Sequence, residues 1–203
     1  MANADRPRGL TPIRHMNGSP WNGAMEIYYH STANGVAVYK GSIVQSDVGL
    51  AAPSSDPLGI YACVVMATDA DADVLGVAWA FGKTPQLMTR VDDLAAANYC
   101  PLSTGMYIGV ITDPSVVYLI QDDGTTLTAA QIGLNTDVVS NTSGSTVTGR
   151  SSGELEQGSL VATTAQLRIL RVHNRPDNEL GAWCDYEVVF NENIFKDADY
   201  LTT

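Results

Sequence analysis

The stretch MYIGVIT (residues 106–112), DPS (113–115) and VVYLIQ (116–121) decides the fold class. Both apolar runs are rich in β-branched and aromatic residues, and each has the length of one strand rather than of a stable helix. The Asp-Pro-Ser tripeptide between them consists of turn residues. The sequence therefore predicts two strands that are joined as a hairpin by a short loop.

Similar runs of Val, Ile and Tyr recur along the rest of the chain, separated by turn residues. No run of about a dozen residues keeps a helical period, so the chain is predicted to be all-β, with minor short helices at 91–98 and 127–132. We expect a compact body that resembles a β-barrel or a β-sandwich. The predicted strands are 26–30, 36–39, 42–45, 60–67, 74–81, 87–91, 106–112, 116–121, 146–149, 166–173 and 183–190.

Local chemistry supports two of the turns and one strand. Gly41 and Gly124 stand where a tight turn requires a positive φ angle. In the run 167–171, apolar residues nearly alternate with Arg168 and Arg171. This pattern predicts a strand with one buried face and one wet face.

The first 25 residues differ from the rest of the chain. They hold three arginines against one aspartate, so they carry about +2, whereas residues 26–203 carry about −13. Prolines at 7, 12 and 20 and glycines at 9, 18 and 23 exclude a long helix or an interior strand. We predict an extended arm over 1–25 and one β-rich domain over 26–203. The arm is either bound to a partner or packed on its own body, where its arginines would only balance charge.

Composition limits the possible partners. With 45% hydrophobic and 16% charged residues, the 203-residue chain is predicted to fold around a full core. Its net charge of −11 argues against nucleic acid, because phosphate binding depends on clustered Lys and Arg. The apolar run 60–67 is too short to cross a bilayer, and no apolar stretch follows the arginines of the leader as in a secretion signal, so no membrane partner is expected. Cys63, Cys100 and Cys184 form no CxxC pair and are predicted to be buried thiols in a reducing cytosol.

Residues 149–153 (GRSSG) match the GxSxG pattern of hydrolases, with Ser151 as the nucleophile. His173 is the one histidine that follows it in the hydrolase order. The surrounding stretch, 135–153, is rich in Ser, Thr, Gly and Asn, which favours a flexible serine loop. We therefore expect no catalytic residues, and we expect no cofactor because neither a P-loop nor a dinucleotide fingerprint is present.

Asp69, Asp71 and Asp73 have the spacing that opens a calcium loop. However, Val74 stands where that loop requires glycine, and an alanine replaces its bidentate glutamate. A solvated acidic turn is favoured, so we expect no metal site, and loose calcium binding is the alternative.

Asn141 begins an NTS glycosylation sequon, which has no meaning without a secretory route.

The segment 174–181 (NRPDNELG) places polar residues between two strong strands. It is predicted to be a loop initiated by proline, and Arg175 and Asp177 are candidate contacts to another subunit. Three aromatic residues follow the arm or lie at its end. They are either anchors buried on the chain's own body or hot spots of an interface. These residues are Trp21, Tyr28 and Tyr29.

The stretches 5–14 (DRPRGLTPIR) and 17–23 (NGSPWNG) resemble the amino terminus of a family of head proteins of tailed bacteriophages, whose members open with a similar Gly-Leu-x-Pro and Asn-Gly-x-Pro leader. The match covers nearly the whole chain and is loosest at 50–98. It continues at 39–44 (YKGSIV), 111–121, 132–135 (IGLN), 165–170 (AQLRIL), 175–181 and 190–193 (FNEN).

The resemblance implies a decoration, or cement, protein that binds the outer surface of the assembled head and stabilises contacts between major capsid protein subunits. Such proteins have neither cofactors nor catalytic residues, and they form homotrimers, which we favour, or homodimers. The chain would be made in the host cytoplasm and end on the virion. The hypothesis is that the arm adds a strand to a coat-protein edge or fills a groove between subunits. The predicted capsid-binding residues are Arg6, Arg8, Leu10, Ile13, Arg14 and Trp21.

Two other classes of function are left open. One is a carbohydrate- or receptor-binding β module of a virion, with exposed aromatic residues at a loop rim. The other is a serine hydrolase that acts through Ser151. A glycan array and a fluorophosphonate label, respectively, would detect these activities.

Overall fold

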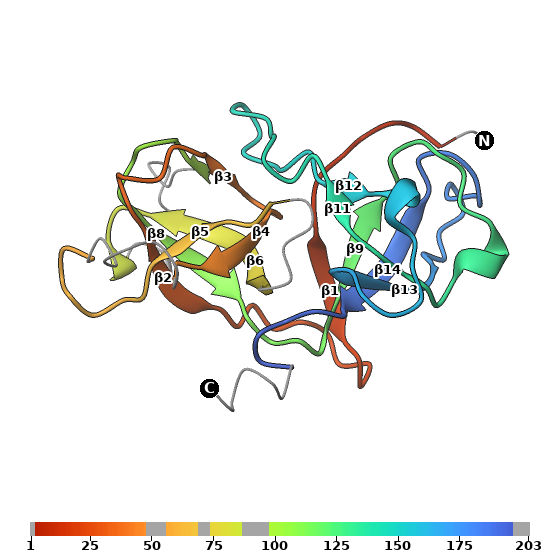
Figure 1. Cartoon of the computed structure of the whole chain (residues 1–203), viewed down its shortest axis with the longest axis horizontal. Coiled ribbons are helices and arrows are strands. Elements are labelled where there is room, and N and C mark those ends of the chain that lie inside the picture. The colour runs from red at the N-terminus through yellow and green to blue at the C-terminus, as the bar shows by residue number, and fades with distance from the viewer. Residues whose placement is uncertain (1–2, 48–55, 69–73, 87–97, 197–203) are drawn as a thin grey trace.

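The computed structural model describes residues 3–47, 56–68, 74–86 and 98–196. Figure 1 shows two lobes side by side, each built on one antiparallel sheet of five strands. Sheet A has the strand order β1-β9-β14-β13-β10, and sheet B has the order β2-β8-β6-β4-β5. The prediction of an all-β fold is therefore confirmed. Within the described ranges the helical turns are of the 3-10 type, and none is α-helical.

Sheet A is formed by β1 (Thr11–His15), β9 (Val116–Gln121), β14 (Asp185–Phe190), β13 (Leu167–Val172) and β10 (Asn135–Thr136). Sheet B is formed by β2 (Glu26–His30), β8 (Met106–Ile111), β6 (Val74–Gly82), β4 (Ile43–Ser46) and β5 (Val64–Met66). Shorter elements are β3 (Val38–Tyr39) with β7 (Tyr99–Cys100), β11 (Val138–Val139) with β12 (Glu154–Leu155), and the 3-10 turns η2 (Ala129–Gln131) and η3 (Gln157–Ser159).

The main hydrophobic core contains residues from both sheets. Successive side chains of a strand point to opposite faces, and the inward set of β9 is Val116, Tyr118 and Ile120. Sheet B contributes Val74 and Val77 of β6 to the same cluster. The two sheets therefore share this main core, to which the arm also contributes Leu10.

Sheet B curls around a second core that holds Leu75 of β6 and Ile108 of β8. An isolated parallel bridge joins Tyr29 of β2 to Cys63, one residue before β5, so the two edges of the sheet meet at one end. No ladder joins β2 to β5 along the described strands, so the sheet is not a closed barrel.

The predicted hairpin of β8 and β9 is wrong. Both strands lie where the sequence places them, but β8 pairs with β2 and β6, whereas β9 pairs with β1 and β14. The turn itself is present, since the Ser115 amide donates to Oδ1 of Asp113 at 2.8 Å. Every residue of both strands is buried. Each strand already has a neighbour on both sides within its own sheet, so the turn carries the chain from one sheet to the other.

The local predictions are correct at two glycine turns and wrong at one strand. Gly41 and Gly124 have φ angles of +92° and +84°, as their turns require. The predicted strand 146–149 is wrong, because a turn is closed there by a 2.7 Å hydrogen bond from the Gly149 amide to the Ser145 carbonyl. The predicted helix 127–132 is reduced to η2. The predicted strand 87–91 and helix 91–98, except Asn98, lie outside the described residues.

Residues 3–25, the described part of the predicted arm, are packed on the chain's own body. They contain β1, an edge strand paired with β9, in which Pro12 is tolerated because an edge strand has an unpaired side. Leu10 is fully buried in the main core, and its amide donates to the Gly41 carbonyl at 2.9 Å. Of the two arrangements left open for the arm, the structure has the packed one.

Candidate functional site

A pocket of about 330 Å³ lies where the first residues of the chain cross the ends of β9 and β14. Four of the predicted site residues meet in it, namely Arg6 and Arg8 from the arm and Arg175 and Asp177 from the 174–181 loop. We name it the arginine pocket. Its lining residues are Asn3, Ala4, Arg6, Arg8, Gln121, Arg175, Asp177, Trp183 and Asp185.

Two side-chain amides fasten the arm to the body. Gln121, the last residue of β9, accepts a hydrogen bond from the Arg6 amide at 2.7 Å and donates to the carbonyls of Ala4 and Trp183, each at 2.9 Å. Asn3 donates to the carbonyls of Glu179 and Ala182 at 2.7 and 3.0 Å. The backbone on both sides of the pocket is thereby fixed without using any guanidinium group.

Asp185, the first residue of β14, joins the two arginine-bearing segments. Its side chain is 2% exposed. Oδ1 lies 2.6 Å from Nη2 of Arg8, and Oδ2 lies 3.2 Å from Nη2 of Arg175. Arg175 also pairs through Nε with Asp177, which is exposed. The buried carboxylate is therefore neutralised from both sides, as a buried charge requires.

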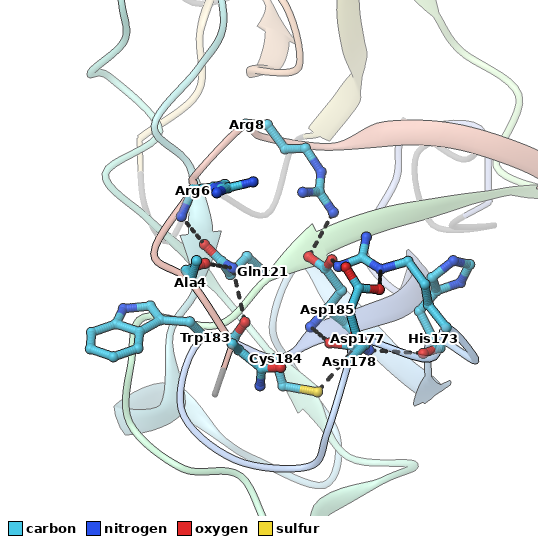
Figure 2. A network of polar contacts seen from close by, with 12 residues as sticks. Ala4, Arg6, Arg8, Gln121, His173, Asp177, Asn178, Trp183, Cys184 and Asp185 are labelled. Atoms are coloured by element: carbon cyan, nitrogen blue, oxygen red, sulfur yellow. Dashed lines mark hydrogen bonds and ion pairs between the residues drawn. The ribbon is translucent and has the colours of Figure 1, made fainter. Parts of the chain in front are cut away.

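The guanidinium of Arg6 is not held by a carboxylate in this way, although its charge contributes to lowering the pKa of Asp177. In Figure 2 the dashed line at Arg6 starts from its backbone nitrogen, and the side chain extends over the pocket toward Arg8. Among the described residues it forms neither an ion pair nor a side-chain hydrogen bond. The pocket thus contains three guanidinium groups and two carboxylates, and its net charge is positive.

Trp183 forms one rim of the pocket in an unusual backbone conformation. Its φ angle is +56°, which a bulky residue rarely adopts. The buried Asp122 holds it, because Oδ1 accepts from the Trp183 amide at 2.6 Å and Oδ2 from the Cys184 amide at 3.2 Å. Burial raises the pKa of Asp122 to about 6, although these hydrogen bonds favour the charged form. Trp183 as a whole residue is 38% exposed, and an added Cβ at Gly124 would lie 2.7 Å from the indole Nε1.

The charged face of sheet A continues from the pocket along β14. The Glu187 side chain is 4% exposed. Its carboxylate oxygens lie 2.8 Å from Nη2 of Arg14, 3.0 Å from Nη2 of Arg171 and 3.1 Å from Nδ1 of His173. Burial alone would raise its pKa, but the hydrogen bonds from these three residues outweigh burial and lower it. Arg168 is exposed on the same face, since its partner in the ladder, Val189, lies two residues from Glu187. We name the set Arg6, Arg8, Arg14, Arg168, Arg171 and Arg175, with Asp177, Asp185 and Glu187, the arginine face.

Two of the three apolar residues predicted for the arm pack against the main core. Leu10 lies in the main core, and Ile13 is half-buried at the register shift of β1 between Pro12 and Arg14. Trp21 is also half-buried, with its ring edge-on to Trp79 at a centroid distance of 5.8 Å. Leu10 and Trp21 therefore have a structural role in this chain.

Tyr28 and Tyr29 lie on β2 in the other lobe and do not meet the arginine pocket. Tyr29 is 8% exposed and packs against Tyr107 at a centroid distance of 5.2 Å. The Tyr28 hydroxyl donates to Glu26 at 3.1 Å, and burial, together with this carboxylate, raises the pKa of Tyr28 to about 12. The structure separates these two aromatic residues from the other predicted contacts.

The geometry at Ser151 does not resemble a nucleophile elbow. Ser151 is 1% exposed, and its hydroxyl accepts a hydrogen bond from the Gly153 amide at 3.0 Å. The strand β12 follows it in place of the helix of a hydrolase elbow. His173 contacts Glu187 at 3.1 Å.

Asn141 is also structural. It is 1% exposed, and its side-chain amide donates to the carbonyls of Ile43 and Ala67 at 3.0 and 2.8 Å. The three cysteines are free and buried, as predicted. Asp69, Asp71 and Asp73 lie outside the described residues.

Two further features are absent from the described ranges. No group of three or more His, Cys, Asp or Glu residues in them could hold a metal ion. None of their helices is long and apolar enough to cross a membrane.

Sequence reasoning missed the residues that organise the pocket, namely Gln121, Trp183 and Asp185, and it also missed Glu187. One signal was available in β14 (DYEVVF), where two carboxylates alternate with Tyr and Val. Carboxylates in a strand that is otherwise apolar need cationic partners. The arginines of the arm were the nearest excess of positive charge, but the sequence does not state which carboxylate each arginine meets.

No family model, curated protein sequence or solved structure matches this chain.

Proposed function

We propose that this chain is a decoration, or cement, protein of a tailed-bacteriophage head, which binds the outer surface of the assembled coat and stabilises contacts between major capsid protein subunits. The proposal starts from the sequence resemblance. The observation that supports it is the one-sided distribution of cationic residues. Six of the eleven Lys and Arg residues lie on the arginine face, although the whole chain carries −11.

A cationic face on an acidic protein orients the molecule at a negatively charged surface. On this proposal the arginine face lies against acidic patches of the coat, while the acidic remainder faces solvent. Exposed guanidinium groups, such as those of Arg6, Arg168 and Arg171, make the first contacts. Many copies around a shell then add avidity.

The packed arm changes the expected mechanism of binding. Residues 3–25 already form β1 and bury Leu10, so no ordering of this segment has to accompany binding. A preformed surface loses less conformational entropy on binding than a segment that folds on its target. We therefore propose docking of a rigid face in place of strand addition by a loose arm.

Deletion of residues 1–20 is a poor test of this function. It would remove β1 and Leu10 and expose the edge of β9, so the truncated chain would lose stability whether or not the arm contacts the coat. Point variants of exposed residues avoid this problem. Arg168→Glu reverses one charge on the arginine face, and Lys83→Glu reverses one exposed charge elsewhere as the matched control.

The experiment is co-sedimentation of each variant with mature capsids that lack this protein, over a series of salt concentrations. We expect the unmodified chain and Lys83→Glu to bind with affinity that falls as salt rises. Arg168→Glu should bind at least about tenfold more weakly. Failure of the unmodified chain to bind would refute the function, and unchanged binding by Arg168→Glu would refute the arginine face as the contact.

The proposal includes a homo-oligomer, a trimer in preference to a dimer. Sedimentation equilibrium of the free protein measures this state directly. A monomer at micromolar concentration would refute a stable trimer in solution, whereas capsid binding would still be decided by the co-sedimentation experiment.

The second candidate is a carbohydrate- or receptor-binding module of a virion, because Trp183 is an exposed aromatic residue at a pocket rim. Aromatic rims of this kind present a flat apolar surface with polar groups nearby. A glycan array with reproducible hits that Trp183→Ala abolishes would favour this candidate over the cement function.

A further inference from the structure

We propose that the arginine pocket binds the carboxylate side chain of an acidic peptide segment, with an apolar neighbour of that side chain lying on Trp183. The inference rests on the proposed function in one respect only, that the peptide belongs to the coat. Three observations support the inference: the hydrogen-bonding groups that remain free in the pocket, the net positive charge of the pocket, and the fixed position of the Trp183 indole.

The neutral polar groups of the pocket are already occupied. Gln121 donates to two carbonyls and accepts from one amide. Asn3 likewise donates to two carbonyls and accepts from the Glu179 amide at 3.1 Å. Neither side chain has a hydrogen atom left for a ligand. The neutral side chains therefore leave a ligand mainly the charged groups of the lining to bind.

The donors that remain belong to guanidinium groups. The described hydrogen bond of Arg6 is made by its backbone nitrogen, and its guanidinium acts on Asp177 through charge, so the guanidinium N–H groups are available to a ligand. Arg8 is bound to Asp185 through Nη2 alone, so its other nitrogens retain hydrogen atoms. Planar guanidinium groups match carboxylates in geometry and form charge-assisted hydrogen bonds with them. The chemistry of the pocket is thus complementary to an anionic, planar acceptor.

Trp183 gives the pocket an apolar side. Its backbone lies in a strained region and is held there by the Asp122 carboxylate, so the indole is kept at the rim. Residues in such conformations persist where surrounding structure fixes them, and they concentrate at binding sites. An apolar side chain next to the bound carboxylate would cover the 38% of Trp183 that is exposed.

The dimensions of the pocket suit a short segment. Its volume of about 330 Å³ is at the lower end of the range of about 300–1,000 Å³ for ligand pockets. It accommodates one or two side chains of a peptide rather than a larger ligand. The exposed positions of Arg6 and Asp177 leave its mouth open to a protein surface.

The test is a titration of the full chain with the peptide Ac-Gly-Glu-Leu-Gly-NH2, whose only charge is the glutamate, and with its glutamine twin. The readout is the NMR resonance of the Trp183 indole N–H, which Trp183→Phe identifies among three tryptophans. We expect a saturable shift at millimolar peptide that weakens with salt. Arg6→Ala should weaken binding about tenfold, because one charge-assisted contact is lost, whereas Lys83→Ala should leave it unchanged.

Several outcomes would overturn the inference. These are the absence of a saturable shift, an equal response to the glutamine peptide, and unchanged affinity in Arg6→Ala. Tighter binding of glucuronate than of the peptide would overturn the assignment to a peptide. If the protein self-associates and Arg6→Ala abolishes this self-association, the occupant of the pocket is a second copy of the chain. That outcome would overturn the assignment of the occupant to a coat peptide.

The two proposals fail separately. If the chain co-sediments with capsids but does not bind the peptide, the pocket inference is overturned and the cement function stands. If the peptide binds in the predicted manner but no capsid binds, the cement function is overturned, and the pocket keeps its assignment as a carboxylate site.

Discussion

Nη2 of Arg8 lies 2.6 Å from Oδ1 of Asp185, and this ion pair joins the first and last parts of the chain across 177 residues. The aspartate is almost completely buried, whereas Arg8 is 22% exposed. The pair therefore fastens the arm to β14 and at the same time builds the wall of the arginine pocket. Stability and site geometry depend on the same contact.

Arg8→Ala should lower the free energy of unfolding by about 1–2 kcal/mol, measured by urea denaturation. Removing one partner of a buried ion pair can cost about 3–5 kcal/mol. The expected loss is smaller here because Arg8 is partly exposed and Arg175 still pairs with Asp185. Lys83→Ala is the surface control and should change stability by less than about 0.5 kcal/mol.

A double-mutant cycle separates the pair from its surroundings. Asp185→Asn alone and together with Arg8→Ala should give a coupling energy of about 1 kcal/mol or more. Additive losses would show that Arg8 contributes through packing of its aliphatic stem and not through the ion pair.

The sequence predicted most strand positions because their signals are local. β2 and β9 begin and end at the predicted residues, since β-branched and aromatic runs there are bounded by turn residues. Strand pairing is not local. The Asp-Pro-Ser turn is compatible with a hairpin and with a crossing between sheets, and the distant partners of β8 and β9 give the crossing. β10 has two residues, and a strand of that length is too short for its sequence to show the alternation of buried and exposed positions.

The candidate site was predicted in part for the same reason. Arg6, Arg8, Arg175 and Asp177 were identifiable by composition, because the arm is basic in an acidic chain and the 174–181 loop is polar between strands. That they share one pocket depends on β14, which delivers Asp185 between them. No spacing along the sequence encodes a contact between residues so far apart.

Gly41→Ala should destabilise the fold by about 3 kcal/mol or more in urea denaturation. Its φ angle is +92°, and an added Cβ would lie 2.9 Å from the Arg8 carbonyl oxygen and 3.1 Å from that of Leu10. The substitution combines backbone strain of about 1–2 kcal/mol with displacement of the arm. Gly18→Ala is the matched control, because Gly18 has a φ angle of +89° with nothing within 4 Å of an added Cβ. Equal losses in both variants would show that the arm does not pack closely on Gly41.

His30 should stay neutral at pH values where a free imidazole is half protonated. It is fully buried, with Nδ1 3.3 Å from the Thr104 carbonyl and 3.4 Å from Sγ of Cys100. Burial lowers its pKa, and its backbone contacts and the nearby Asp47 oppose this only in part. The folded state then binds fewer protons than the unfolded state, so His30 destabilises the fold as pH falls below about 6.5. Ring NMR shifts of His30 that follow an ordinary titration near pH 6.5 would contradict this prediction.

Glu154→Gln should stabilise the protein at pH 8, and the gain should vanish as the solution is acidified. Burial, together with the nearby carboxylates of Asp5, Asp123 and Asp122, raises the pKa of Glu154 to about 7. The folded state therefore binds more protons than the unfolded state, so the destabilisation by Glu154 is full above about pH 7 and is relieved as pH falls toward about 4.5. The measurement is the difference in midpoint of thermal unfolding between Glu154→Gln and the unmodified chain at pH 8, 6.5 and 5. Glu156→Gln, which removes a charge two residues away, is the matched control. A gain for Glu154→Gln that is independent of pH would show that its effect does not come from the raised pKa.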